Sequence, residues 1–175
     1  MSTPTASAVT IPPPGAYRLD PASSTISFKT RAMFGLLPVK GTFNVTAGTL
    51  VVADEVSAST LTATAGANSF NTGNDKRDHH VTSQDFLHAD AHPDLTYQST
   101  SVTESAGRWV LHGDLVARGT AAPLDLTVVS AETRGNTVTV EATGSVDRYA
   151  HRITRGKGMA GRRLQLTVTA VATRD

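Results

Sequence analysis

The chain contains no cysteine, only nine aromatic residues (five Phe, three Tyr and one Trp) and no long apolar run, and each absence excludes a class of protein. Without cysteine there are no disulfides and no thiolate zinc ligands. Sixteen basic and fifteen acidic residues leave a net charge of +1 and are spread along the chain, so we expect neither nucleic acid nor an anionic membrane as partner. No apolar stretch approaches the roughly 18 residues of a transmembrane helix, so we expect no integral membrane segment.

The N-terminal stretch MSTPTASAVTIPPPG is polar and ends in three prolines and a glycine. It has neither the basic start nor the apolar centre of a signal peptide. We therefore predict a flexible leader over residues 1–15, a single domain over residues 16–175 and a cytoplasmic location.

Most of the remaining chain alternates apolar and polar residues with a period of two. In residues 25–30, for example, Ile26 and Phe28 fall on one face and polar residues on the other. The same analysis assigns strands to residues 39–45, 48–52, 59–67, 95–101, 108–118, 122–130, 137–146 and 163–173. These eight or nine strands, joined by short turns, predict an all-β fold: an extended antiparallel barrel of about eight strands, with a two-sheet sandwich as the alternative.

Several inward-facing positions carry unusually small side chains: Ala63, Ala65, Ala67, Ala142, Gly144, Ala170 and Ala172. Alanine is common in tightly packed interiors, so these positions are compatible with a solid core. They are equally compatible with a hollow interior lined by methyl groups, which would suit a long apolar ligand. Composition does not separate the two interpretations.

One segment, NSFNTGNDKRDHHVTSQDF (residues 68–86), interrupts the alternation. Asp75 is a residue type favoured at helix N-caps, and Asp78 three residues later would complete a capping box. We expect about two turns of helix ending near Thr82, with Ser83 capping a further turn. A helix of this size would lie across one end of the barrel.

The same part of the chain holds the candidate metal ligands. Asp75 and His79 are four residues apart, as are His88 and His92, whereas His79 and His80 diverge by roughly 100° on a helix. No established metal spacing, nucleophile elbow or phosphate-binding loop is present. We therefore expect no catalytic residue, metal or cofactor, and keep a metal-dependent lipid-modifying enzyme using Asp75, His79, His88 and His92 as the alternative.

Three stretches carry a resemblance to a known family: YRLDPASSTISFKTRAMFGLLPVKGTFNVTAGTL, SFNTGNDKRDHHVTSQDFLHADAHPDLTYQST and WVLHGDLVARGTAAPLDL. In these stretches, and over residues 17–173 as a whole, the chain resembles the YceI-like polyisoprenoid-binding proteins. The resemblance implies a lipocalin-like barrel that holds a long isoprenoid or other lipid without acting as an enzyme. Some members of the family are exported.

The resemblance also implies roles for particular residues. Asp75, Arg77, Asp78 and His79 would lock the helix as a lid onto the strand ends. The interior would be lined by large side chains, for which the candidates are Phe28, Phe34, Phe43, Phe70, Phe86, Tyr97, Trp109, Leu111 and Leu115. Apart from the resemblance, we expect Lys76, Arg77 or Arg152 to hold a lipid head group at the rim. A homodimer formed through the outer β-surface or a barrel edge is a further hypothesis.

Overall fold

The computed structural model describes residues 9–175 and is all-β with one α-helix. Its ten strands are β1 (Gly15–Leu19), β2 (Thr25–Ala32), β3 (Leu37–Phe43), β4 (Val45–Val52), β5 (Thr60–Gly66), β6 (Asp94–Ser105), β7 (Arg108–Ala117), β8 (Thr120–Arg134), β9 (Thr137–Asp147) and β10 (Arg163–Arg174). The helix is α1 (Asp75–Thr82), and three single 3₁₀ turns are η2 (Val56–Ala58), η3 (Ala67–Ser69) and η4 (Arg148–His151). Within the described residues no helix is long and apolar enough to cross a bilayer.

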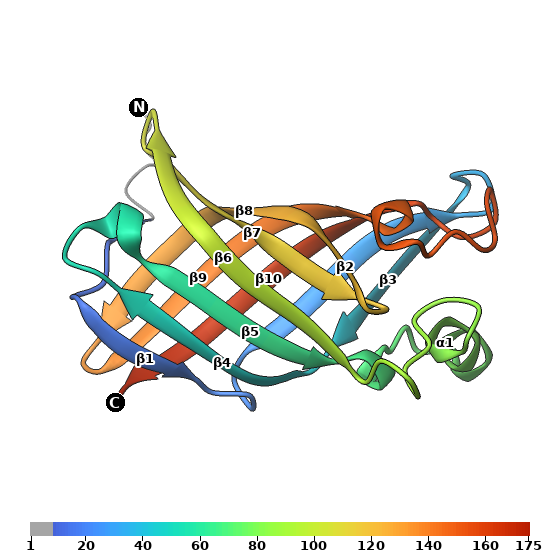
Figure 1. Ribbon diagram of the computed structural model, residues 1–175, viewed down its shortest axis with the longest axis horizontal. Helices are drawn as coiled ribbons and strands as arrows, with labels where there is room; N and C mark the ends of the chain where they lie inside the picture. Colours follow the sequence, from blue (N-terminus) through green and yellow to red (C-terminus); the bar gives the residue numbers. More distant parts are fainter. Residues whose placement is uncertain (1–8) are drawn as a thin grey trace.

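The strands form one antiparallel sheet in the order β1-β4-β5-β6-β7-β8-β9-β10-β2-β3, and β1 also pairs with β10 (Figure 1). This extra pairing closes eight strands into a barrel, so the predicted barrel is confirmed and the sandwich is wrong. Strand β10 pairs with two strands along one of its edges: residues 172–174 pair with β1, and residues 165–169 pair with β2. Strands β1 and β2 therefore follow one another along the same side of β10.

The strands assigned from the sequence correspond to β2–β10 and omit β1, which a break in the chain separates from β2. The carboxylate of Asp20 accepts hydrogen bonds from Ala22 N at 3.1 Å and Ser23 Oγ at 2.7 Å, which turns the chain. The buried Ser24 hydroxyl then accepts from Val171 N at 3.0 Å and donates to Val171 O at 3.3 Å. A serine side chain thus replaces a backbone partner of β10 where the strand is interrupted.

Residues 1–8, the first part of the predicted leader, lie outside the described residues. From Val9 onward the chain follows the barrel: Val9 forms a bridge with Ala131 of β8, and Thr10 N donates to Ala131 O at 2.9 Å. Tyr17 Oη donates to Pro13 O at 2.6 Å. The segment before β1 therefore lies against the end of the barrel opposite α1 (Figure 1).

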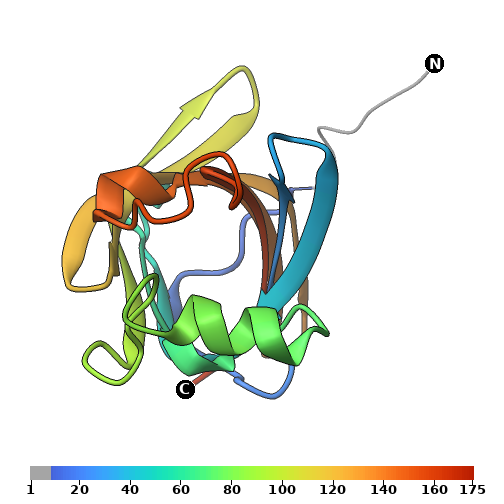
Figure 2. The same cartoon turned by 90° about the vertical axis from the view of Figure 1, so that its right-hand side faces the viewer.

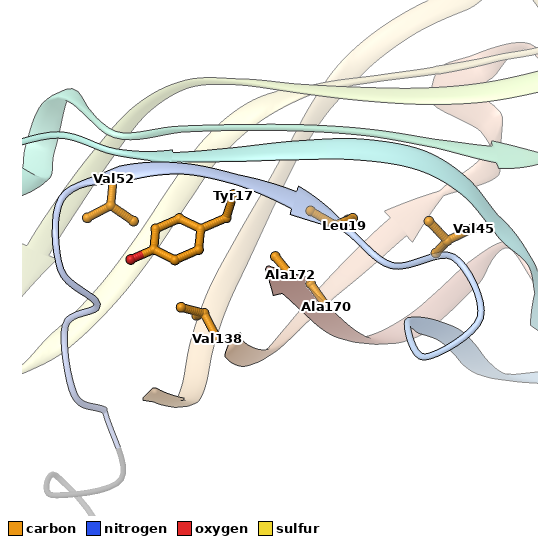
Figure 3. Close-up of a cluster of buried hydrophobic side chains, with 7 residues drawn as sticks. All are labelled: Tyr17, Leu19, Val45, Val52, Val138, Ala170 and Ala172. Atoms are coloured by element: carbon orange, nitrogen blue, oxygen red, sulfur yellow. The ribbon is translucent and has the colours of Figure 1, made fainter. Parts of the chain in front are cut away.

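A compact cluster of buried side chains fills the barrel beside β1 (Figure 3). Its largest member is Tyr17, which is 1% exposed, and Ala172 of β10 lies beneath it at 1% exposure. The full cluster is Tyr17, Leu19, Val45, Val52, Val138, Ala170 and Ala172. Here the small residues allow close packing, which is the solid-core interpretation.

Elsewhere the small residues have other surroundings. Ala63, Ala65 and Ala142 line interior cavities, and Ala170 lies at the boundary, since it belongs to the cluster and also lines a cavity. Gly144 instead marks a close approach of two strands, because a Cβ there would lie 2.6 Å from Asp125 O. Both interpretations of the small residues therefore hold, in different parts of the same barrel.

The predicted helix is confirmed as α1, which ends at Thr82 and lies across part of one open end of the barrel (Figure 2). Its cap was predicted one residue too late: Asn74 is the N-cap, with Oδ1 accepting from Arg77 N at 3.1 Å. Asp78 does not complete a capping box, since its carboxylate accepts from Thr72 N and Thr72 Oγ1. The turn at Gly73, with φ of +80°, folds Thr72 back onto the first turn of the helix.

Candidate ligand-binding site

The barrel interior contains two apolar cavities that share wall residues. The first, here called the N-terminal chamber, has a volume of about 110 Å³, and Val9 and Ile11 form part of its wall. The second, the lid chamber, has a volume of about 150 Å³, and Leu87 and Ile153 form part of its wall. Both chambers are lined by Leu61, Leu126 and Val168, so they follow one another along the barrel axis.

Side chains with polar atoms are few in either wall. In the N-terminal chamber they are Ser59, Thr60 and Trp109, and in the lid chamber Thr64, Tyr97, Arg148 and His151. The remaining lining residues are aliphatic or aromatic. Strand alternation explains this wall, because every second side chain of each strand points inward and those positions carry the apolar residues.

Tyr97 is one of the polar side chains that line the lid chamber. Its ring passes over Gly113, where a Cβ would lie 2.6 Å from Tyr97 Oη, and the hydroxyl donates to Leu124 O at 3.0 Å. Burial, and next the carboxylates of Asp125 and Asp114, raise the pKa of Tyr97 well above its usual range. The phenol is therefore neutral, and its proton is already engaged.

An apolar cluster covers the lid chamber on the side of α1. Its buried members are Phe86, Leu87, Ala117 and Ile153, with Phe43, Phe70, Val81, Leu95 and Ala160 packed against them. Arg118, at the end of β7, holds the segment after α1 by donating to the carbonyls of Gln84 and Phe86, the latter at 2.7 Å. The segment after α1 is thus fixed by apolar contacts and by the guanidinium group of Arg118.

The residues predicted to lock the lid occupy two different environments. Arg77 Nε donates to Thr72 Oγ1 at 2.9 Å, and Thr72 Oγ1 donates to Asp78 Oδ1 at 2.6 Å, so both residues meet at Thr72. Asp75 and His79 are exposed, and their side chains make no hydrogen bond or ion pair within residues 9–175. The connection between helix and turn therefore runs through Arg77, Asp78 and Thr72.

The nine candidate lining residues also separate into groups. Trp109 and Leu111 line the N-terminal chamber, and Phe43, Tyr97 and Leu115 line the lid chamber. Phe28 and Phe70 stack with ring centroids 5.2 Å apart, and Phe86 belongs to the lid cluster. Phe34 is 77% exposed at the tip of the β2–β3 hairpin, where its φ of +57° belongs to a turn, and it faces neither chamber.

The candidate metal ligands are not brought together. Among residues 9–175 there is no group of three or more His, Asp or Glu side chains that could hold a metal ion. The His88 and His92 rings pack edge to face at 5.7 Å, and His92 covers Gly119. The structure therefore offers no support for the metal-dependent enzyme.

The outer surface carries a row of groups that resembles a hydrolase triad. Thr103 Oγ1 lies 2.8 Å from His112 Nε2, and His112 Nδ1 lies 2.9 Å from Asp125 Oδ1. The side chains of His112 and Asp125 are 36% and 60% exposed, and none of the three residues lines either chamber. We interpret the row as a cross-strand interaction of β6, β7 and β8.

Arg148 and His151 line the lid chamber and were not predicted as site residues. Desolvation lowers the pKa of Arg148 from its usual value, with Tyr149 and Asp147 acting in the opposite sense, and arginine stays cationic in proteins. The predicted head-group residue Arg152 is exposed, with a left-handed φ of 62°. A sequence signal for these two residues was available. Asp147 is a good helix cap at the end of a strand, and Arg148 and His151 follow it three positions apart, so they would share one face of a 3₁₀ turn.

A closed antiparallel barrel with a helical lid and an apolar interior defines the class of lipocalin-like ligand-holding folds. Residues 17–172 match the YceI-like domain, and the chain belongs to this family. The UPF0312 proteins of Pectobacterium atrosepticum and Staphylococcus aureus are 32% identical over 87 residues and 35% identical over 105 residues. These matches cover 49% and 59% of this chain, and they span 45% and 58% of the relatives' own lengths.

Solved structures share the fold. BcnA of Burkholderia cenocepacia superposes with a TM-score of 0.78 at 20% identity, over 89% of this chain and 99% of that one. A domain of Saccharophagus degradans, described as polyisoprenoid binding, gives 0.68 at 12% identity, over 91% and 98%. The YceI protein of Campylobacter jejuni gives 0.61 at 21% identity, over 76% and 84%. At these identities the likeness concerns the fold.

Proposed function

We propose that the protein is a non-enzymatic binding protein that holds one long-chain amphiphilic lipid, a polyisoprenoid or a similar molecule, inside the barrel. The observation that carries this proposal is the pair of chambers with common walls at Leu61, Leu126 and Val168. A single extended apolar chain could occupy both chambers, with its sides against aliphatic residues. The polyisoprenoid-binding description of the Saccharophagus degradans domain supports the same ligand class.

The energetics of burial favour such a ligand. An apolar chain of ~20 methylene groups gains ~0.8 kcal/mol for each group removed from water, hence ~16 kcal/mol in total. Association itself costs about 4–15 kcal/mol, before the loss of chain flexibility is counted. Burial of the chain can therefore supply the affinity, while a few polar groups select the head group.

Five of the predicted lining residues are retained as contacts of the proposed ligand: Phe43, Tyr97, Trp109, Leu111 and Leu115. The lid role of Asp75, Arg77, Asp78 and His79 is likewise a proposal. It is supported for Arg77 and Asp78 by their shared contact with Thr72. Substitution of Arg77 or Asp78 should weaken the attachment of α1 to the turn at Thr72 without altering the apolar walls of the chambers.

Extraction of the purified protein into organic solvent, followed by mass spectrometry, tests the proposal directly. We expect a lipid with a long apolar chain, in an amount near one molecule per protein. After delipidation, the protein should rebind a C20 isoprenoid, which can be followed by the fluorescence of Trp109, the single tryptophan and a wall residue of the N-terminal chamber. A protein that yields no lipid and binds no chain of any length would contradict the proposal.

A further inference from the structure

The lid chamber contains two buried groups that can carry charge. Arg148 is 6% exposed and His151 is 2% exposed, and the other buried polar residues of the described chain are serines. Both belong to η4, where residues three positions apart lie on the same face because a 3₁₀ helix has about three residues per turn. Asp147 caps this turn by accepting from Tyr149 N at 3.0 Å. A single short turn therefore directs both polar groups toward the chamber.

Arg148 is held by the protein but is not neutralised by it. Its Nε donates to Gly161 O at 2.8 Å, Nη1 to Ile153 O at 2.7 Å and Nη2 to Ala160 O at 3.1 Å. A guanidinium group has five N–H donors, so two have no acceptor among residues 9–175.

No carboxylate in residues 9–175 forms an ion pair with Arg148. The adjacent Asp147 is occupied by Arg162, which donates to both of its carboxylate oxygens at 2.9 Å. The rings of Phe86 and Tyr149 lie 5.6 Å and 5.0 Å from the Arg148 guanidinium carbon. A cation surrounded in this way by carbonyls and aromatic rings lacks a counter-charge.

His151 is the second polar group in this part of the wall. Its Nδ1 lies 2.8 Å from Thr120 O, which can only accept, so Nδ1 carries the proton. In the neutral ring Nε2 is then left as an acceptor. The lid chamber thus offers a cationic donor and an acceptor at one end, whereas the N-terminal chamber contains no charged group in its wall.

A purely structural role for Arg148 explains part of these contacts, since three carbonyl bonds tie residues 153–161 to η4. It does not explain why a charged group faces an apolar chamber. Uncharged donors could hold the same carbonyls, and burial of an unpaired cation is unfavourable. A ligand that brings a negative charge would provide what the protein lacks.

We propose that Arg148 binds an anionic oxygen head group, a carboxylate or a phosphate, while the apolar tail of the same ligand extends past Tyr97 toward Trp109. This inference rests on the proposed lipid-binding function and specifies the head group and the orientation of the ligand. The head lies beneath the lid cluster and the tail end lies in the N-terminal chamber.

The first test uses the delipidated wild-type protein and four C20 isoprenoid ligands that differ only in the head: geranylgeranoic acid, geranylgeranyl phosphate, geranylgeraniol and geranylgeranylamine. Binding is measured by Trp109 fluorescence and by calorimetry. We expect at least one anion to bind ten times more tightly than the alcohol, and the ammonium form to bind most weakly. The two anion arms distinguish a carboxylate from a phosphate head.

Equal affinity for the alcohol and both anions would overturn the head-group assignment while leaving the lipid-binding function intact. If none of the four ligands binds, the proposed function itself fails. The two failures are therefore distinguishable.

The second test removes the charge. Arg148→Met should reduce the preference for the anion over the alcohol to about onefold, whereas Arg148→Lys should keep a preference for the anion. Arg155→Met is the matched control, because its side chain is 73% exposed on the following loop and the change in net charge is the same. An unchanged preference in Arg148→Met, or an equal loss in Arg155→Met, would overturn the proposal. Should Arg148→Met fail to fold, the wild-type ligand series still decides the question.

A different observation concerns the outer surface at the same end of the barrel. Five of the large hydrophobic residues that are exposed form one surface, here called the apolar tip: Met33, Phe34, Leu36, Leu37 and Met159. Phe34 and Leu36 are 77% and 83% exposed. The β2–β3 hairpin is joined to the loop before β10 because Met33 N donates to Met159 O at 2.8 Å. Figure 2 shows this hairpin and loop at the same barrel end as α1.

Basic residues are concentrated in the segment that carries Met159. Residues 152–163 contain five of them and no acid: Arg152, Arg155, Lys157, Arg162 and Arg163. Arg155 and Arg162 pair with Asp85 and Asp147, and the other three have no carboxylate partner within the described chain. An exposed apolar projection with basic residues beside it is complementary to an anionic lipid surface.

We infer that the apolar tip inserts into an anionic bilayer and brings the lid end of the barrel to the membrane. The test is co-sedimentation with vesicles of phosphatidylglycerol and phosphatidylcholine, compared with phosphatidylcholine alone. We expect binding to the anionic vesicles, weaker binding in 0.5 M salt, and at least a tenfold loss in Phe34→Asp/Leu36→Asp. The control Val51→Asp/Val129→Asp changes two exposed valines elsewhere on the barrel.

Absence of binding to anionic vesicles, or the same loss in the control, would overturn the membrane assignment. A dimer in light scattering that Phe34→Asp/Leu36→Asp abolishes, without vesicle binding, would assign the apolar tip to a second copy of the chain. That result would also contradict the inference.

Discussion

The two chambers of the barrel share strands β5 to β10 but differ in chemistry. The wall of the N-terminal chamber is formed by strand residues, η2 and the segment around Val9, and it contains no charged group. The lid chamber includes Arg148 and His151, and both come from η4 and not from a strand. Strand alternation places apolar side chains inside, so a polar group enters the interior mainly where a strand gives way to a turn.

The largest effect is expected from closing the lid chamber. Ala63 lies in the wall of this chamber, and Ala63→Phe would place a ring in the space that head and tail must share. We expect the affinity for C10 and C20 anionic lipids to fall at least 100-fold, measured by calorimetry. Far-UV circular dichroism should show an unchanged barrel. Retention of C20 binding would show that the ligand does not occupy the lid chamber.

Filling the N-terminal chamber with a larger side chain should lower the affinity for long ligands more than the affinity for short ones. Val140 lines the N-terminal chamber, and Val140→Phe would shorten the space available to the tail. We expect at least a tenfold loss of affinity for the C20 ligand and less than a threefold change for the C10 ligand, because the shorter tail ends in the lid chamber. An equal loss for both lengths would contradict the proposed orientation.

The strands and the helix could be predicted from the sequence, because both depend on the period of the apolar pattern. The alternation in residues 137–146 and 163–173 predicted strands that the structure places side by side, and repeated hairpins predicted closure. The helix was predicted because residues 75–82 break the alternation, although Asn74 and not Asp75 caps it. Both residue types cap helices well, so local sequence alone does not choose between them.

Other features depend on contacts between distant segments and could not be predicted. Phe34 is a predicted lining residue, and the structure places it 77% exposed in a hairpin turn. The burial of Arg148 depends on the carbonyls of a loop that folds back over it. The net charge of +1 is a sum over the whole chain, so it does not reveal that residues 152–163 contain five basic residues and no acidic one. The cytoplasmic location and the homodimer stay predictions.

The lid chamber also differs from the N-terminal chamber in the way it is covered, and Arg118 tests this difference. Arg118→Met removes the donors to the carbonyls of Gln84 and Phe86, so we expect a loss of about 1–2 kcal/mol in the free energy of unfolding. Hydrogen exchange should accelerate in residues 83–88 but not in residues 9–14. Arg134→Met is the control, since Arg134 is 85% exposed at the other end. Uniform acceleration across the chain would point to general destabilisation.

The smallest effect concerns the turn that carries Arg148. The hydrogen bonds from Arg162, and secondly the one from Tyr149 N, hold the pKa of Asp147 below its usual value of 3.8. A carboxyl whose pKa is lowered by folding contributes stability above its unfolded pKa, and that contribution is lost as the pH falls through the folded pKa. Wild type should therefore lose more stability than Asp147→Asn between pH 5 and about pH 2, as measured by urea unfolding. Asparagine caps as well as aspartate, so Asp147→Asn should keep η4 in place and leave the affinity for geranylgeraniol unchanged; a loss of that affinity would mean that the Asp147 charge also supports the chamber wall.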